Sequence, residues 1–256
     1  MVHPTAIVHP GARIAESVEI GPYAVIGEHV RIGARTTVGP HTVIEGWTEI
    51  GEDNKIFQFA SVGAIPQDLK YHGEKAFLKI GDRNTIREFV TMHLGTEDGG
   101  GETVVGDDSL FMAYAHVAHD CRVGNRVILA NAATLAGHVI IDDQAIIGGL
   151  SAIHQFTRIG AHVMVSGGSI VVQDIPPFTI AQGDRAKTVG LNLVGMKRRG
   201  FSRESINAVK KAYRTMFRAG LRTEEALKQL EEGSAAFAEV KEFTDFIQNS
   251  ERGIAR

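Results

Sequence analysis

The sequence predicts a mainly β protein, a left-handed parallel β-helix of hexapeptide repeats followed by a small α-helical C-terminal domain. Two observations support this prediction. An Ile or Val recurs at every sixth residue from Val8 to Val62, a spacing that fits neither the helical period of 3.6 nor the strand period of two. Beyond about residue 190 this pattern stops and apolar residues take up helical spacing. The expected domains are therefore residues 1–190 and 191–256.

Each hexapeptide is expected to form one short strand and one corner, because β-branched residues suit a pleated and packed interior. Three hexapeptides close one triangular coil of about 18 residues. The repeat resumes at Ile80 and runs from Val105 to Val171 after a second interruption. Glycine often follows the aliphatic residue, as at Gly21 and Gly33. We expect these glycines to adopt the unusual backbone angles of a tight corner.

Two insertions interrupt the repeat, at residues 64–78 and 94–103. Insertions in a solenoid leave the coil at a corner and often gather on the binding face. The alternative is that both are tolerated surface loops.

The repeat is expected to end near residues 174–178, where two prolines break the pattern. Ser202 is a candidate N-cap for a first helix that Gly220 closes, and Thr223 is a candidate cap for a second. The apolar positions of these helices and of a third are Ile206, Val209, Tyr213, Met216, Phe217, Ala226, Leu227, Leu230, Val240, Phe243 and Ile247.

Composition narrows the class of protein. The net charge of -3 and the pI near 6.4 argue against a general nucleic-acid-binding surface. The single cysteine, Cys121, allows no internal disulfide and favours a reducing compartment. The N-terminus lacks a signal-peptide pattern, and no apolar run reaches the roughly 18 residues that span a bilayer. We therefore expect a cytoplasmic protein without a membrane span.

Histidines and other polar residues converge in the second half of the repeat. With a coil of about 18 residues, His119 lies above Gly137 and Gln155, and His138 and His154 lie within one residue of that column. A structural role is the simpler interpretation for any one of these histidines, but the convergent set indicates a site.

A neutral His119 could accept a proton from an alcohol. Asp120 could raise its basicity and fix its tautomer, but neighbours on a strand point to opposite faces, so a corner must lie between them. The Gly137 amide could donate to an oxyanion. No recognisable Ser or Cys nucleophile motif is present, and Cys121 is assigned to packing. These features favour direct transfer over a covalent enzyme intermediate.

A metal is the competing interpretation, because His116 and His119 form a His-x-x-His pair. Two histidines at that spacing are a weak signal, so no metal and no cofactor is expected. Residues 196–200 contain a basic segment that could bind phosphates or an acidic carrier protein, or could be a solvated approach to a helix.

Several longer motifs carry a resemblance that covers the chain essentially end to end. They are residues 67–71, 80–84, 116–121, 135–139, 153–156, 174–177 and 197–202. In these motifs the chain resembles the UDP-N-acetylglucosamine O-acyltransferase family. The resemblance implies transfer of an (R)-3-hydroxyacyl group from acyl carrier protein to the 3-hydroxyl of UDP-N-acetylglucosamine, the first step of lipid A synthesis, by a homotrimer with sites between subunits.

The resemblance also implies roles for individual residues. His119 matches the general base, Asp120 the acid that supports it, and Gly137 the oxyanion donor. Positions that contact the sugar or acyl group match Asp68, Lys70, His116, His138, His154 and Gln155. Positions that hold the nucleotide match Asn192, Arg198 and Arg199.

Three positions bear on the finer details. Leu94 stands where the family commonly has arginine, and Val194 where it often has an acid, which affects expected contacts at the cleft and at the nucleotide. Gly167 matches the position that measures acyl length. Its lack of a side chain predicts room for a long chain such as 3-hydroxymyristoyl.

Three alternatives remain open. A related N-acyltransferase of a later sugar nucleotide would carry an extra N-terminal domain, for which repeats starting at about Val8 leave no room. A gamma-type carbonic anhydrase would bind zinc through histidines. A purely structural β-helix would need no His119.

Overall fold

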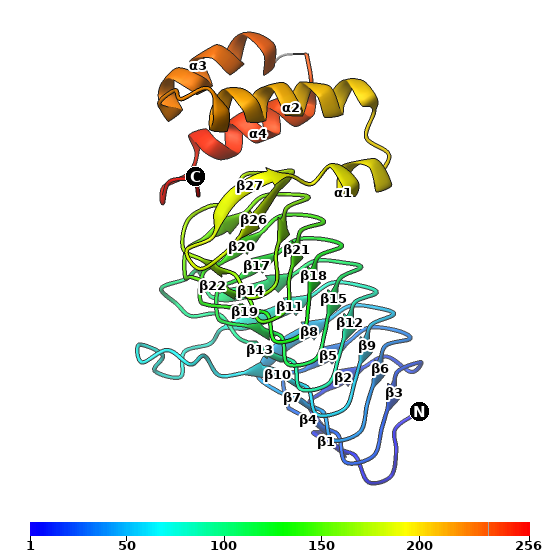
Figure 1. The fold of residues 1–256 in the computed structure, drawn as a ribbon. Coiled ribbons are helices and arrows are strands. Elements are labelled where there is room, and N and C mark those ends of the chain that lie inside the picture. Colours follow the sequence, from blue (N-terminus) through cyan, green and yellow to red (C-terminus); the bar gives the residue numbers. More distant parts are fainter. Residues whose placement is uncertain (235) are drawn as a thin grey trace.

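The computed structural model describes residues 1–234 and 236–256, and they form a long β-helix with helices stacked on one end (Figure 1). All strand pairs except the last are parallel, and the strands form three sheets. Paired strands in neighbouring regular coils lie 18 residues apart, as for Val25 opposite Val43. The predicted left-handed parallel β-helix with a small helical region is confirmed.

The chain visits the three sheets in turn. The first sheet contains β1 (Ile7–Val8), β4 (Val25–Ile26), β7 (Val43–Ile44), β10 (Ser61–Ala64), β13 (Thr91–His93), β16 (His116–Val117), β19 (Thr134–Leu135), β22 (Ala152–Ile153) and β25 (Ile170–Val171). The second contains β2 (Arg13–Ile14), β5 (Arg31–Ile32), β8 (Trp47–Ile50), β11 (Phe77–Ile80), β14 (Glu102–Val105), β17 (Arg122–Val123), β20 (Ile140–Ile141) and β23 (Arg158–Ile159). The third contains β3 (Glu19–Ile20), β6 (Thr37–Val38), β9 (Lys55–Ile56), β12 (Thr85–Ile86), β15 (Leu110–Phe111), β18 (Ile128–Leu129), β21 (Ile146–Ile147), β24 (Met164–Val165), β26 (Thr179–Gln182) and β27 (Lys187–Leu191).

These sheets meet at three edges. We call them the first edge (between the first and second sheets), the second edge (between the second and third) and the third edge (between the third and first). The aliphatic residue of each repeat points inward, and from Ile20 onward it is buried, as for Ile26, Ile44 and Leu135. Burying such a side chain contributes about 1.5–3 kcal/mol of transfer free energy, so stacked coils supply the stability of the β-helix.

The positive φ expected for the glycine after each aliphatic residue is present at Gly63, where φ is 83°, but the expectation was wrong for Gly21 and Gly33. Gly21 and Gly33 are absent from the positive-φ positions of the described chain, and the residue two places further on occupies that region, as at Tyr23 and Arg35. A Cβ on Gly33 would lie 2.6 Å from the carbonyl carbon of Gly51 in the next coil. These glycines allow coils to stack closely.

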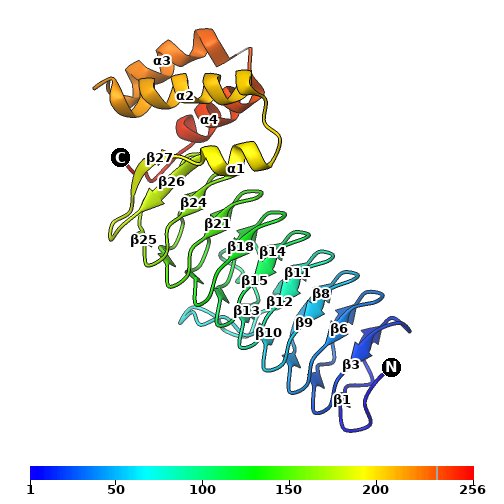
Figure 2. The ribbon, with the colours of Figure 1, turned by 45° about the vertical axis from the view of Figure 1, so that its right-hand side comes forward.

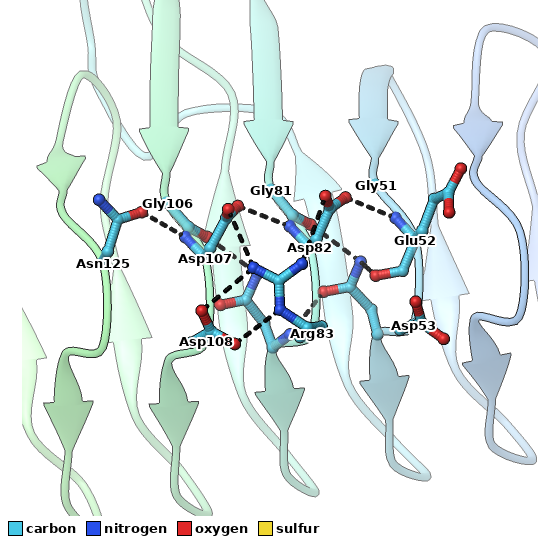
Figure 3. Close-up of polar contacts among 12 residues, drawn as sticks. Gly51, Glu52, Asp53, Gly81, Asp82, Arg83, Gly106, Asp107, Asp108 and Asn125 are labelled. Atoms are coloured by element: carbon cyan, nitrogen blue, oxygen red, sulfur yellow. Dashed lines mark hydrogen bonds and ion pairs between the residues drawn. The ribbon is translucent and has the colours of Figure 1, made fainter.

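Polar side chains bridge neighbouring coils along the second edge (Figure 3). The Asp82 carboxylate accepts the Glu52 amide at 2.7 Å, and Asp107 accepts the Asp82 amide at 2.8 Å. We call this series the second-edge ladder. Arg83 pairs with Asp108 on its outer side at 2.7 Å. Inside the corner, Asn84 accepts the Ser109 amide and donates to the Gly106 carbonyl, both at 2.9 Å.

Both insertions leave the β-helix at a corner, as expected, and both do so at the first edge. The first loop joins β10 to β11 and the second joins β13 to β14. The first loop is held to the second sheet by Lys75, whose Nζ lies 3.7 Å from the Trp47 ring centroid. The two loops therefore emerge one coil apart on the same side of the prism.

The β-helix ends in a β-hairpin, which the prolines near residues 174–178 did not predict. β26 and β27 pair antiparallel, and β26 also extends the third sheet beyond β24. Four helices follow: α1 (Leu193–Arg198), α2 (Arg203–Arg218), α3 (Thr223–Ser234) and α4 (Ala238–Gln248). They cover the C-terminal end of the prism (Figures 1 and 2).

The three predicted helices are present, and α1 is an additional one. The Ser202 hydroxyl accepts the Ser205 amide at 2.9 Å, which confirms the predicted cap of α2. Gly220 has a φ of 70° just beyond the α2 C-cap, and α3 begins at Thr223. None of the helices within the described residues is long and apolar enough to cross a bilayer.

Candidate active site

His119 and Asp120 lie together at the first edge. Asp120 has a φ of 60°, so the chain turns between the two side chains. This corner lets the Asp120 carboxylate reach back to His119, with 2.8 Å between Oδ2 and Nδ1. A carboxylate is only an acceptor, so Nδ1 carries the proton and Nε2 remains the basic nitrogen.

Asp120 is buried, and its carboxylate has a second partner that sequence reasoning missed. Oδ1 accepts the Thr96 amide at 2.8 Å, and Oδ2 accepts the Thr96 hydroxyl at 2.7 Å. Thr96 belongs to the second loop. The only signal in the sequence was that this insertion leaves the coil at the edge that carries His119.

The first loop supplies groups on the other side of His119. Asp68 Oδ2 lies 3.9 Å from His119 Nε2. A hydrogen bond from the Lys70 amide, followed by the positive charges of His119 and Lys70, lowers the pKa of the Asp68 carboxyl. The exposed Lys70 ammonium lies 3.8 Å from Asp98 in the second loop. Two loops therefore border the open side of the histidine.

Gly137 lies one coil beyond His119 as predicted. A Cβ there would lie 2.5 Å from His119 Cε1, so only glycine leaves room for the ring. Among the described residues, the Gly137 amide donates to no protein acceptor. That amide is available to a ligand.

His138 also adjoins the His119–Asp120 pair. Its ring meets the His119 ring edge-on at 5.1 Å and stacks on Phe156 at 4.4 Å. Its Nε2 lies 3.7 Å from Asp120 Oδ2. Burial is the main cause that lowers the pKa of His138, and it outweighs the opposing effect of Asp120. The ring is therefore mainly neutral at pH 7.

His116 and His93 extend the row of imidazoles across the first sheet. His116 Nδ1 lies 2.6 Å from the Thr91 hydroxyl, and burial lowers the pKa of His116. His93, which was not among the predicted site residues, packs edge-on against His116 at 5.0 Å. Burial followed by the charge of His116 lowers the pKa of His93 to about 4.

His154 and Gln155 lie on the same edge, one coil further toward the helices, and both are exposed. His154 Nδ1 lies 3.0 Å from the Gln155 carbonyl oxygen and 3.4 Å from Arg252 Nη2. Phe156 donates its amide to the Gly137 carbonyl. The column predicted from the 18-residue spacing is therefore present.

The predicted nucleotide residues lie on a different edge. Asn192 caps α1 by accepting the Gly195 amide and donates to the His162 carbonyl on the second edge, both at 2.9 Å. Arg199 donates to the Gln144 carbonyl at 3.0 Å, and burial lowers the pKa of its guanidinium. Arg198 is exposed. One chain does not bring these residues to His119.

The remaining positions are also accounted for. Gly167 lies on the third edge, where a Cβ would be 3.2 Å from the Gly149 carbonyl oxygen. Leu94 is buried in the core, so its side chain does not face the cleft. Val194 is exposed on α1.

A cation could be considered at one group within the described chain. Donor atoms of His119, Asp120 and His138 lie within 4.8 Å of one another. However, both Asp120 oxygens already accept hydrogen bonds, and His119 Nδ1 is bonded to one of them. This group differs from the His116 and His119 pair that the competing metal interpretation rested on. The geometry suits a base and its supporting acid.

Comparison with known proteins decides the family. The hexapeptide repeat profile of bacterial transferases matches residues 11–46 and 102–137, and the profile of UDP-N-acetylglucosamine O-acyltransferase domain 2 matches residues 174–255. An acyl-[acyl-carrier-protein]–UDP-N-acetylglucosamine O-acyltransferase from Janthinobacterium sp. (strain Marseille) is 56% identical over 260 residues, which cover 100% of this chain and 99% of that protein. The chain belongs to this acyltransferase family.

Further relatives support the same assignment. The namesake enzyme of Burkholderia orbicola is 58% identical over 259 residues, covering 100% of this chain and 99% of that protein. Among solved structures, LpxA of Acinetobacter baumannii is 43% identical with a TM-score of 0.96, covering 100% of this chain and 99% of that one. The Francisella novicida UDP-N-acetylglucosamine acyltransferase is 40% identical with a TM-score of 0.98, covering 100% and 94%.

Proposed function

We propose that this acyltransferase moves an (R)-3-hydroxyacyl group from acyl carrier protein to the 3-hydroxyl of UDP-N-acetylglucosamine, as the first step of lipid A biosynthesis in the cytoplasm. The names of its relatives supply the substrate classes. The observation that carries the mechanism is the orientation of His119, with Nδ1 bonded to Asp120 and Nε2 on the side of Asp68 in the first loop.

In this proposal, His119 Nε2 accepts the proton of the sugar hydroxyl while the hydroxyl oxygen attacks the thioester carbonyl. The new C–O bond forms, the C–S bond breaks, and the imidazolium returns its proton to the leaving thiolate. Asp120 stabilises the imidazolium, and the Gly137 amide donates to the developing oxyanion. Base assistance of this kind is typically worth about 10²–10⁴ in rate, and positioning supplies the remainder. No metal or cofactor is required.

Substrate contacts are expected from both parts of the chain. We assign the sugar and acyl groups to Asp68, Lys70, His116, His138, His154 and Gln155. We assign the nucleotide to Asn192, Arg198 and Arg199. The two domains, residues 1–190 and 191–256, would thus each contribute to binding.

We further propose a homotrimer in which each site lies between two subunits. The separation of Arg199 from His119 on different edges of one chain is consistent with this arrangement. A ridge of stacked aromatic rings along the third edge also supports it, since contiguous exposed apolar groups mark interfaces. The ring centroids lie 4.8–5.2 Å apart along Tyr23, His41, Phe59, Phe89 and Tyr114.

The acyl chain is proposed to be 3-hydroxymyristoyl. Gly167 leaves no side chain in the groove position that the family uses to measure length, although Gly149 lies close behind it. A ten-carbon preference in a competition between 3-hydroxyacyl carriers would contradict this assignment.

The direct test is acyl transfer by the purified protein with UDP-N-acetylglucosamine and a set of 3-hydroxyacyl carrier proteins. His119→Ala should lose about 10²–10⁴ in rate while its mass in solution stays that of a trimer. Metal content is measured alongside. Full activity in the variant would refute the base assignment, and no product with any donor would refute the reaction. Zinc near one per subunit would favour the hydratase alternative, which no relative named above supports.

A further inference from the structure

We propose that Thr96 is a positioning residue for the transfer reaction, acting through Asp120 on His119. This inference rests on the proposed function. No hydrogen bond joins Thr96 to His119 itself. Its two donors bind the carboxylate that holds His119.

The Thr96 contacts fix the orientation of Asp120. The amide and hydroxyl of Thr96 each bind one carboxylate oxygen, so the carboxylate cannot rotate about its Cβ–Cγ bond without breaking a hydrogen bond. Oδ2 is shared by the Thr96 hydroxyl at 2.7 Å and His119 Nδ1 at 2.8 Å. Thr96 is 3% exposed and Asp120 is 5% exposed. Such buried hydrogen bonds to a charged group are strong.

The second loop is shaped to bring Thr96 to this place. The Thr96 carbonyl accepts the amides of Gly99 and Gly101 at 3.1 and 2.7 Å, which curls the loop over the carboxylate. A Cβ on Gly99 would lie only 1.9 Å from Asp120 Cγ. The loop backbone therefore covers Asp120 closely, so the carboxylate has protein donors where water would otherwise bind.

The Thr96 hydroxyl also tunes the electrostatics of the pair. A hydrogen bond donated to Oδ2 disperses the negative charge of the carboxylate. Without that donor, the carboxylate would attract the imidazolium more strongly, and of the two Thr96 hydrogen bonds only the one from the amide to Oδ1 would still orient it. The base would then be more fully protonated at a given pH, and His119 would be less well aligned.

Thr96→Val tests this role because valine keeps the shape and the backbone amide but lacks the hydroxyl. We expect kcat to fall about tenfold, as misalignment of a catalytic group predicts, with KM for UDP-N-acetylglucosamine nearly unchanged. The acid limb of the kcat/KM profile should move to higher pH. Thr96→Ser should restore both values. Thr42→Val is the matched control, because Thr42 is buried on the third edge and bonds the Phe57 carbonyl.

An activity-independent readout separates this inference from the proposed reaction. Histidine ¹⁵N signals, assigned with His119→Ala, should show the His119 titration moved to higher pH in Thr96→Val but not in Thr42→Val. An unmoved titration would overturn the inference, as would a loss of kcat that only matches a loss of folded protein. Absence of transfer in the wild type, with the titration moved, would refute the reaction and retain the positioning role.

Discussion

The first and second edges of the prism share one coil geometry, but their polar side chains serve different purposes. On the second edge, Asp82 and Asp107 accept backbone amides from the adjacent coil, and Arg83 neutralises the carboxylates beside it. On the first edge, Asp120 accepts from Thr96 in an inserted loop and from His119. One set of contacts joins coil to coil, while the other orients a base.

This difference teaches what converts a structural corner into a candidate active site. Both edges hold polar residues at positive φ, as at Asp108 and Asp120. On the first edge, two insertions leave the coils, and Gly137 leaves room for an imidazole. Thr96 then reaches Asp120 from outside the regular coils, and His119 Nε2 remains free to accept a proton.

Equivalent glycine substitutions on the two edges should give the largest difference, with activity lost on the first edge and stability lost on the second. The Cβ of Gly137→Ala would lie 2.5 Å from His119 Cε1, and that of Gly124→Ala would lie 2.4 Å from Asp143 Oδ1 and 2.9 Å from its backbone nitrogen. We expect about 10²-fold lower kcat for Gly137→Ala, since a displacement of about 1 Å has that cost. Gly124→Ala should instead lower stability by about 1–3 kcal/mol. Transfer assays and thermal unfolding would measure both, and equal activity losses would contradict the distinction.

Buried neutral histidines make both edges sensitive to acid. Burial lowers the pKa of His93 and of His162 from 6.5 to about 4. Below pH 6.5 the unfolded chain binds protons that the folded chain does not, so stability falls as pH drops toward 4. Each shift amounts to roughly 3 kcal/mol at most.

Urea unfolding from pH 7 to pH 4 would measure this dependence. Replacing either His93 or His162 by Gln should reduce the proton uptake on unfolding by about one near pH 5. If the free energy of unfolding of His162→Gln varied with pH as steeply as that of the wild type, the second edge would not share the acid sensitivity.

Asn84→Ala should destabilise the second edge without altering the transfer reaction. The substitution leaves the Ser109 amide and the Gly106 carbonyl without the partners that Asn84 provides. Buried unpaired groups of this kind cost about 1–3 kcal/mol each. We expect a lower urea midpoint with kcat per folded molecule unchanged. A fall in kcat at full folding would argue that the two edges are coupled.

Arg83→Gln should have the smallest effect. Its ion pairs with Asp107 and Asp108 are solvent-exposed and therefore weak. We expect a slightly lower melting temperature than wild type in low salt and no difference at 1 M NaCl, because salt screens exposed charges. A difference that persists in high salt would mean that the Arg83 side chain contributes by packing.

The repeating parts of the molecule could be predicted because the sequence period equals the structural period. Counting in sixes from Val8 places the inward residues, and 18 residues place Gly137 on His119. Thr96 could not be found in this way. It lies 24 residues before Asp120 rather than 18, because the insertion shifts the count.

The C-terminal end of the β-helix was also harder to predict. Pro176 and Pro177 suggested an end, but the chain continues as the hairpin of β26 and β27. α1 has only six residues and contains Gly195, so helical propensity did not reveal it. Asn192, which caps α1, also donates to the His162 carbonyl, a tertiary contact that no local pattern encodes.

The helices cover one end of the prism only, and this asymmetry gives unfolding a direction. In stacked repeats each coil is stabilised chiefly by its neighbours, so opening propagates from an end. At the N-terminal end Met1, Val2 and Ile7 are exposed, whereas the last coils are roofed by the helices (Figure 2). The N-terminal coils should therefore fray first in hydrogen exchange, with the coils that carry His119 and Gly137 lying well inside the protected segment.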